Sequence, residues 1–306
     1  MLKQKLGQKI KRLRENKCLS RERFCGDESD LTVRQLARIE NGDSLPSLVK
    51  LEYIHRKLGV PLSDLVDEED IVLPQEYLAL KLQLFKFNTY HNQYLIDKKD
   101  KLFSKIYEEF YELLPEDEQV IIDILQAIAD VHHSSNLLYG QPIIAEYFEQ
   151  VKRKKQYNLT DLMIIRLFFI SLTNSDEIEY PKKLVHHFFI HSTRAFDYSD
   201  VYLIEYATIF YISCLNVLLF HHDFEYIELV FEILDQLLTY SSDVAKKSIS
   251  FMLQAKYFYF CKKDEKTAEE FYTKAIIGAE FIDDMILREK LEKERERDRK
   301  AFAMLY

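Results

Sequence analysis

Tryptophan is absent from this chain of 306 residues, and glycine, proline and cysteine are scarce, with six, six and four residues. Glycine and proline supply the tight turns between strands, so their scarcity argues against a sheet architecture. The four cysteines form no CxxC pair, which fits a reduced, cytosolic protein. A glycine-rich phosphate loop, an HExxH motif and a nucleophile with a turn signature are also missing. We therefore expect neither an enzyme nor a cofactor.

Long apolar runs and metal-ligand spacings are missing too. The longest apolar stretch, 206–220, is shorter than the roughly 20 residues that span a bilayer, and it contains Asn216. No signal peptide precedes the first predicted helix, so we expect a soluble protein without a membrane partner. Three His-His pairs occur, but adjacent residues on a helix point about 100° apart, so none is a natural metal clamp. We predict no metal site.

The charge is divided unevenly along the chain. Residues 1–66 contain 14 lysines and arginines and 9 acids, a net charge of +5, whereas the remainder contains 28 and 42, a net charge of −14. A basic head on an acidic body is expected when one domain meets phosphates and the other stays away from them. The acidic run that starts at Asp67 indicates a solvated linker. We predict a head at 1–66, a linker at 67–72 and a body at 73–306.

The stretch 31–42 combines the features of a helix that contacts DNA bases. Thr32 is a good N-cap, and Gly42 stands where a left-handed residue would end the helix. The apolar residues share one side of a helical wheel, while Arg34 and Arg38 lie on the other. Arginine binds guanine, and glutamine binds adenine, by paired hydrogen bonds in the major groove. An ordinary amphipathic surface helix stays open as the alternative on this stretch alone.

The neighbouring residues make this the third of five short helices, with a tight connection between the second and third, as in a helix-turn-helix domain. The head resembles the lambda-repressor-like (Xre/Cro) family in the segments 19–20, 31–32, 38–42, 46–48 and 58–60. That resemblance implies a structural pair between Arg14 and Glu40. The residues predicted to contact DNA are Arg21, Thr32, Arg34, Gln35, Arg38, Asn41 and Lys50.

The body is predicted to be helical throughout, and hence the fold to be all-α. Apolar periodicity predicts helices at about 73–87, 93–114, 116–136, 142–155, 159–173, 180–194, 200–221, 224–240, 243–262, 265–281 and 284–304. Helix pairs that repeat with short links suggest an α-solenoid. The clearest tetratricopeptide trace is Tyr259, Ala268, Tyr272 and Ala275, and the earlier repeats are degenerate.

A helix-turn-helix head on such a body resembles the RRNPP group of peptide-sensing regulators, and within it the Rgg-like competence regulators. The similar segments are 31–36, 44–48, 114–116 and 148–155. The resemblance implies a cytoplasmic quorum-sensing regulator that binds a short apolar signalling peptide and then promoter DNA, activating competence-type genes. Because the head is small, we expect a homodimer on an inverted repeat. The alternative is an Xre-family repressor whose helical body serves only dimerisation or a protein partner.

The predicted peptide site combines tyrosines with amide side chains. Buried tyrosines need a partner for the hydroxyl, and a concave solenoid surface lined by them would hold an apolar peptide while amide groups bond its backbone. Plain helix packing is the alternative for these aromatic residues. In the resemblance Lys99 lies on the peptide-facing side, where its ammonium would pair with a peptide carboxylate. The predicted peptide contacts are Lys99, Tyr202, Tyr206, Asn216 and Gln254.

Three acids, Glu116, Asp117 and Glu118, stand in the first turn of a predicted helix, where the helix dipole favours them. That dipole is a sufficient structural reason for their presence. Arg34 and Arg38, however, cannot face DNA and pair with carboxylates at the same time. We therefore predict that these acids form an interdomain latch, which holds the head in the off state until peptide binds.

Overall fold

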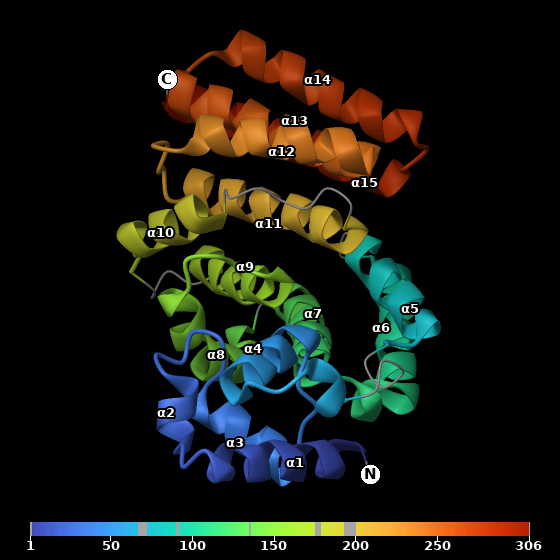
Figure 1. The fold of residues 1–306 in the computed structure, drawn as a ribbon. Helices are drawn as coiled ribbons and strands as arrows, with labels where there is room; N and C mark the ends of the chain where they lie inside the picture. The colour runs from blue at the N-terminus through green and yellow to red at the C-terminus, as the bar shows by residue number, and fades with distance from the viewer. Residues whose placement is uncertain are drawn as a thin grey trace. The chain divides into compact units, whose positions relative to one another are not determined.

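The structure is a computed structural model that describes residues 2–66, 72–89, 92–134, 136–174, 179–192 and 200–305. Every regular element in these ranges is a helix (Figure 1), which confirms the all-α prediction. The chain forms two compact units, one of residues 1–84 and 97–160 and the other of residues 85–96 and 161–306. Most of the predicted linker, residues 67–71, lies outside the described residues, and the predicted domain boundaries stay a prediction.

The head has four α-helices, α1 (Leu2–Asn16), α2 (Arg21–Cys25), α3 (Val33–Asn41) and α4 (Leu48–Leu58), followed by a 3₁₀ turn at Leu62–Asp64. A single apolar core joins them, with Ile10, Leu36 and Ile54 fully buried. At Gly7 an added Cβ would lie 2.1 Å from the carbonyl oxygen of Ile39, so only glycine lets α1 pass this close to α3.

The first unit also contains most of α5 (Gln75–Lys86) and α6 (Gln93–Glu109), and all of α7 (Glu116–Ser134) and α8 (Gln141–Arg153). Short 3₁₀ turns occur at Tyr111–Leu113 and Leu137–Tyr139. The predicted helix 93–114 thus ends earlier, at Glu109. Pro115 precedes Glu116, the first residue of α7, and its carbonyl oxygen accepts from the amides of Glu118 and Gln119. The amide of Glu116, at the first position of the helix, has no acceptor within the helix and is left for an outside partner.

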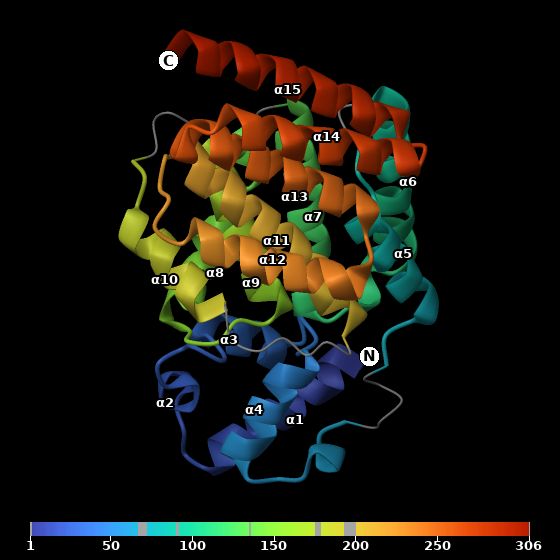
Figure 2. The ribbon, with the colours of Figure 1, turned by 90° about the horizontal axis from the view of Figure 1, so that it is seen from above.

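The second unit contains most of α9 (Leu159–Thr173), then α10 (Lys182–Ser192), α11 (Val201–Phe220), α12 (Ile227–Ser241), α13 (Val244–Tyr257), α14 (Glu265–Phe281) and α15 (Met285–Leu305). A π-helical turn at Phe258–Lys262 follows α13. Helices α13, α14 and α15 lie side by side (Figure 2).

The tetratricopeptide trace occupies the core between these last helices. Tyr259, Ala268 and Tyr272 are fully buried in one cluster, and Ala275 is fully buried in the next. At Gly278 an added Cβ would lie 2.3 Å from Ser248 Oγ, so α14 approaches α13 closely there. Small residues at this crossing let the paired helices pack as the sequence predicted.

Helix α11 is long and apolar enough to cross a membrane by length and composition, and it is the one such helix among the described residues. Of the 18 most apolar consecutive residues of this helix, 67% are buried in the structure, which is typical of a core helix.

Candidate DNA-recognition face and its contacts

The predicted recognition helix is α3, and its N-terminus is formed as the sequence indicated. The Thr32 hydroxyl accepts a hydrogen bond from the Gln35 amide, and the Gln35 side chain accepts one from the Thr32 amide, a complete capping box. Gly42 ends the helix in the left-handed conformation, with φ of 78°. Arg34 and Asn41 are exposed, whereas Arg38 is only partly exposed.

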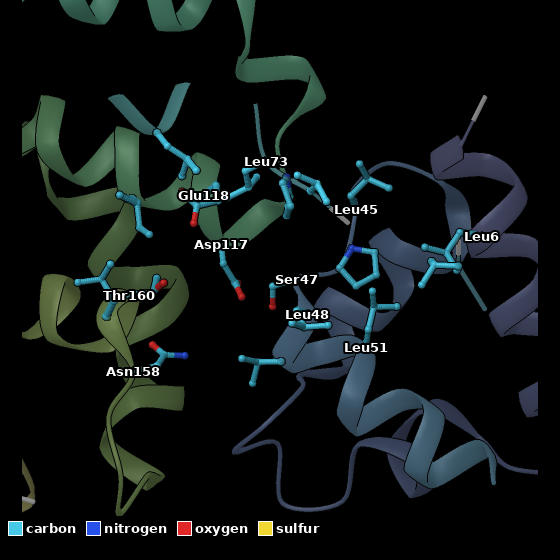
Figure 3. Close-up of a pocket in the computed structure, with 18 of the residues that line it drawn as sticks. Leu6, Leu45, Ser47, Leu48, Leu51, Leu73, Asp117, Glu118, Asn158 and Thr160 are labelled. Carbon is cyan, nitrogen blue, oxygen red and sulfur yellow. The ribbon is translucent and has the colours of Figure 1, made fainter. Parts of the chain in front are cut away.

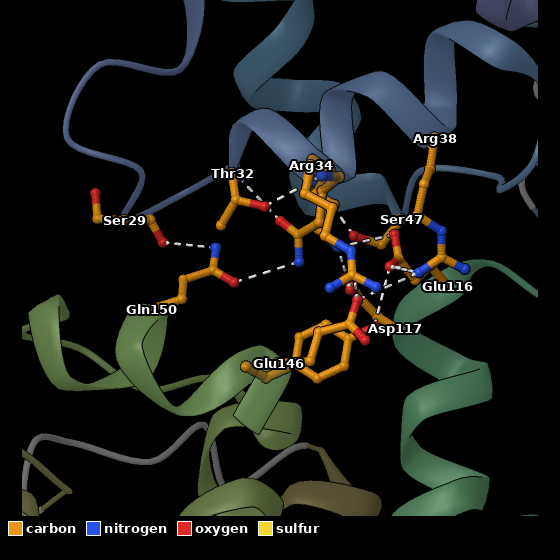
Figure 4. A network of polar contacts seen from close by, with 12 residues as sticks. Ser29, Thr32, Arg34, Arg38, Ser47, Glu116, Asp117, Glu146 and Gln150 are labelled. Atoms are coloured by element: carbon orange, nitrogen blue, oxygen red, sulfur yellow. Dashed lines mark hydrogen bonds and ion pairs between the residues drawn. The ribbon is translucent and has the colours of Figure 1, made fainter. Parts of the chain in front are cut away.

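Arg38 points from α3 to acids on α7 and α8 (Figure 4). Its Nη1 lies 2.8 Å from Glu116 Oε1 and 3.6 Å from Glu146 Oε1. The Tyr147 hydroxyl donates to the same Glu116 oxygen over 3.1 Å. Arg34 is more loosely held, with its Nε 3.4 Å from Glu146 Oε1 and 70% of its side chain exposed. Burial lowers the pKa of Arg38, but Glu116 and Tyr147 outweigh it and raise that pKa above its usual value.

Lys50, at the start of α4, is bound in the same way and is only 5% exposed. Its Nζ lies 2.6 Å from Asp117 Oδ1 and 3.8 Å from Glu116 Oε2. Burial raises the pKa of the Asp117 carboxyl, but the Lys50 ammonium outweighs this and leaves that pKa below its usual value. The amide of Glu116 also donates to the carbonyl oxygen of Leu45, over 3.0 Å. The first turn of α7 therefore binds the head through backbone and side chains together.

Helix α8 holds the other end of α3. Gln35 is only 4% exposed, and its Nε2 donates to Gln150 Oε1 over 3.3 Å. Gln150 in turn donates to the carbonyl oxygen of Ser29, and Arg153 donates to that of Asp27. Three side chains predicted to contact bases or phosphates, those of Gln35, Arg38 and Lys50, are thus bonded to α7 and α8 in this arrangement.

The predicted Arg14–Glu40 pair is confirmed. Arg14 Nε lies 2.5 Å from Glu40 Oε1, and both residues are buried, at 6% and 2% exposure. Arg21 Nε lies 2.8 Å from the second Glu40 oxygen, so this predicted DNA contact also supports the interior of the head. Burial raises the pKa of Glu40, but hydrogen bonds from the two arginines outweigh it and hold that pKa below its usual value.

Of the three acids predicted as a latch, Glu116 and Asp117 contact the head. Glu118 instead accepts hydrogen bonds from Tyr77 and Lys81 of α5. Sequence reasoning missed Glu146 and Tyr147. A signal for Glu146 was nevertheless present in the sequence. Gln150 lies in a segment marked by the resemblance, and Glu146, four residues earlier, lies on the same side of a helix.

The predicted peptide contacts lie in different environments. Lys99 is half-buried on α6, in the first unit, whereas the other four lie in the second. Tyr206 is fully buried, and its hydroxyl lies 3.5 Å from Arg166 Nη1. Tyr202 and Gln254 are partly buried, and Asn216 is exposed. Their role in peptide binding stays a prediction.

One set of possible metal ligands occurs within the described residues: His186, Asp223 and Glu225, whose ligand atoms lie within 4.8 Å of one another. The Lys182 ammonium lies 3.1 Å from both carboxylates. His186 Nε2 lies 2.7 Å from Asp223 Oδ2. A protein cation therefore already stands where an ion would bind, and we interpret the set as an ion-pair network.

The fold, with α3 of the head held against α7 and α8, is that of a transcriptional regulator with a helix-turn-helix head and a tetratricopeptide-like body. The model of the family described as ComR tetratricopeptide matches residues 74–295, so the chain belongs to the ComR family of RRNPP regulators. Comparison with curated proteins finds no significant match.

Solved structures of streptococcal ComR proteins are similar over nearly the whole chain. The apo form of the competence regulator ComR from Streptococcus vestibularis is 32% identical, with a TM-score of 0.84 over 97% of this chain and 99% of that one. The apo form of ComR from S. thermophilus is 33% identical, with a TM-score of 0.83 and the same coverage. The S. thermophilus protein in complex with DNA and its signalling peptide ComS has a TM-score of 0.66, at 33% identity over 96% and 99%.

Proposed function

We propose that this protein is a cytoplasmic quorum-sensing regulator that binds a short apolar peptide in its body and then binds promoter DNA through its head. It acts as a homodimer on an inverted repeat and activates competence-type genes. Support comes from the ComR family and from the similar S. thermophilus structure, whose complex contains DNA and a signalling peptide.

The observation that carries the switching part of this proposal is the bonding of the α3 face to α7 and α8. Arg38 and Lys50 cannot hold Glu116 and Asp117 and at the same time contact DNA. The head is therefore in a closed arrangement that competes with DNA. The higher TM-scores to the two apo forms than to the DNA and peptide complex agree with this assignment.

A two-stage binding experiment tests the function. A thermal-shift screen of short apolar peptides identifies the ligand, because a ligand at 100 times its Kd adds about 2.7 kcal/mol of stability. Fluorescence anisotropy with an inverted-repeat promoter then compares DNA affinity with and without that peptide. If no peptide stabilises the protein and DNA affinity is high without one, the Xre-type repressor is the better description.

Arg34→Ala is expected to weaken binding to the specific operator by about 1–3 kcal/mol and to relax sequence preference, because an arginine bound to a base carries specificity. Arg34 is the informative choice because its side chain is 70% exposed and contributes little to the closed arrangement. Anisotropy titrations with operator and scrambled DNA, at saturating peptide, measure the effect. Lys5→Ala removes the same charge from an exposed position on α1 and serves as the control. An unchanged ratio of the two affinities in Arg34→Ala would show that Arg34 does not contact a base.

Lys99→Glu is expected to weaken binding of a free-acid peptide far more than of the same peptide with an amidated C-terminus. The reason is that the resemblance implies a peptide-facing position for Lys99, where its ammonium would pair with a terminal carboxylate. Isothermal titration of both peptides against parent and variant measures the difference. Equal losses of affinity for the two peptides would rule out the contact between Lys99 and the peptide carboxylate.

A further inference from the structure

A cavity of about 450 Å³ lies at the junction of the head with the rest of the first unit (Figure 3). Its volume is in the range of small-molecule sites. The head contributes one wall through α1, α4 and the residues before α4, and the opposite wall comes from α5, α7 and residues 158–160. Apolar side chains dominate the lining, among them Leu45, Leu48, Leu51, Leu73, Leu78 and Ile121.

The two charged side chains of the lining are acidic, and its other polar side chains, those of Ser47, Gln75, Asn158 and Thr160, are neutral. Asp117 and Glu118 face the cavity together with Ser47, and among the described residues the lining contains no lysine, arginine or histidine. Lys50 and Lys81 pair with these carboxylates but are not part of the lining. An ionised carboxylate only accepts hydrogen bonds and has more acceptor sites than one ammonium fills. A matching occupant is therefore apolar over most of its length and donates hydrogen bonds at one end.

We propose that this cavity binds a small apolar molecule with a protonated amine at one end, and that the molecule holds the head in its closed arrangement. The proposal rests on the proposed function, because it takes the closed head as the state that does not bind DNA. Since both walls are needed to enclose it, the occupant binds the closed arrangement more tightly than the open one. It therefore opposes DNA binding by linkage, without touching DNA or the peptide.

The absence of tryptophan provides a direct assay. Val49 and Val72 both line the cavity and are 56% and 71% exposed, so a tryptophan fits at either position. Val49→Trp and Val72→Trp give two independent reporters. Phe281→Trp, at a position that is 80% exposed at the end of α14, is the matched control.

Octylamine, below the concentration at which it forms micelles, is the probe, and octanoate is the anion of matched length. We expect octylamine to shift the emission of both reporters saturably to shorter wavelength, to leave Phe281→Trp unchanged, and to bind at least ten-fold more tightly than octanoate. A flat or unsaturable titration in both reporters, or equal binding of octanoate, overturns the proposal.

A second arm tests the link to head closure. Glu116→Gln, combined with each reporter, weakens the closed arrangement, and the affinity for octylamine is expected to fall at least five-fold. An unchanged affinity overturns the link. The proposed function is tested separately and fails if Glu116→Gln does not raise DNA binding in the absence of peptide. The two outcomes can be told apart because the tryptophan titration contains no DNA.

Discussion

Glu116→Gln is expected to raise the affinity for promoter DNA in the absence of peptide by 5- to 150-fold, the range that a coupling of about 1–3 kcal/mol gives. Glu116 is 1% exposed and accepts from both Arg38 and Tyr147 through one oxygen, with Lys50 3.8 Å from the other. Removing its charge leaves the half-buried Arg38 without its nearest negatively charged partner. The closed arrangement therefore loses stability while the DNA-contacting side chains stay intact.

Acidic residues of α7 are better targets for this test than the arginines, because Arg38→Ala would remove a DNA contact and a closing contact together. Anisotropy titrations without peptide and at saturating peptide, at one salt concentration, measure the effect. At saturating peptide the parent and Glu116→Gln are expected to bind DNA nearly equally. Glu109→Gln removes the same charge from an exposed position on α6 and corrects for the general attraction of a less acidic protein to DNA.

Tyr147→Phe extends the series, since it removes only the hydroxyl that donates to Glu116. Its effect on peptide-free binding is expected in the same direction and smaller. If Glu116→Gln binds DNA no better than Glu109→Gln without peptide, the closing role of this contact would have to be abandoned.

Local rules predicted much of the head from sequence. Thr32, Gly42 and Gly59 mark helix ends by capping chemistry that acts over a few residues, and α3 and α4 end where these residues stand. Helix bounds in the body agree closely where apolar periodicity is strong, as for 265–281. They differ where a helix ends without such a signal, as at Glu109.

Contacts between distant segments were harder to predict. Gln35 was predicted to face DNA from its place on a helical wheel, but its partner Gln150 stands 115 residues later. The contact of Arg38 with Glu116 could be predicted as a hypothesis, because an acidic helix start in the body can compete with DNA for the arginines of the head. The cavity could not be predicted from the sequence, because its walls come from segments as far apart as residues 2–6 and 158–160, and no local pattern joins them.

Glu40→Ala is expected to lower the free energy of unfolding of the head by about 3–5 kcal/mol, the cost of breaking a buried ion pair by removing one partner. Glu40 is 2% exposed and binds Arg14 and Arg21 with its two oxygens, so both arginines lose their shared buried carboxylate at once. Arg14 is itself 6% exposed and cannot recover the loss by hydration. Because α3 carries Glu40, DNA binding is expected to disappear together with the stability of the head.

Hydrogen exchange of the α3 amides in the full chain measures this loss without requiring the two units to unfold together. Glu15→Ala is the matched control, since Glu15 lies 3.5 Å from Arg14 but is 55% exposed, and its loss is expected to cost at most about 1 kcal/mol. The pKa of Glu40 is lowered in the folded head, so its contribution is complete above the ordinary glutamate value of 4.5 and is lost as pH falls through the folded pKa. The parent is therefore expected to lose head stability below pH 4.5, and Glu40→Ala to lack that part of the pH dependence. Equal protection of α3 in Glu40→Ala and Glu15→Ala would show that the buried pair contributes no more than a surface charge.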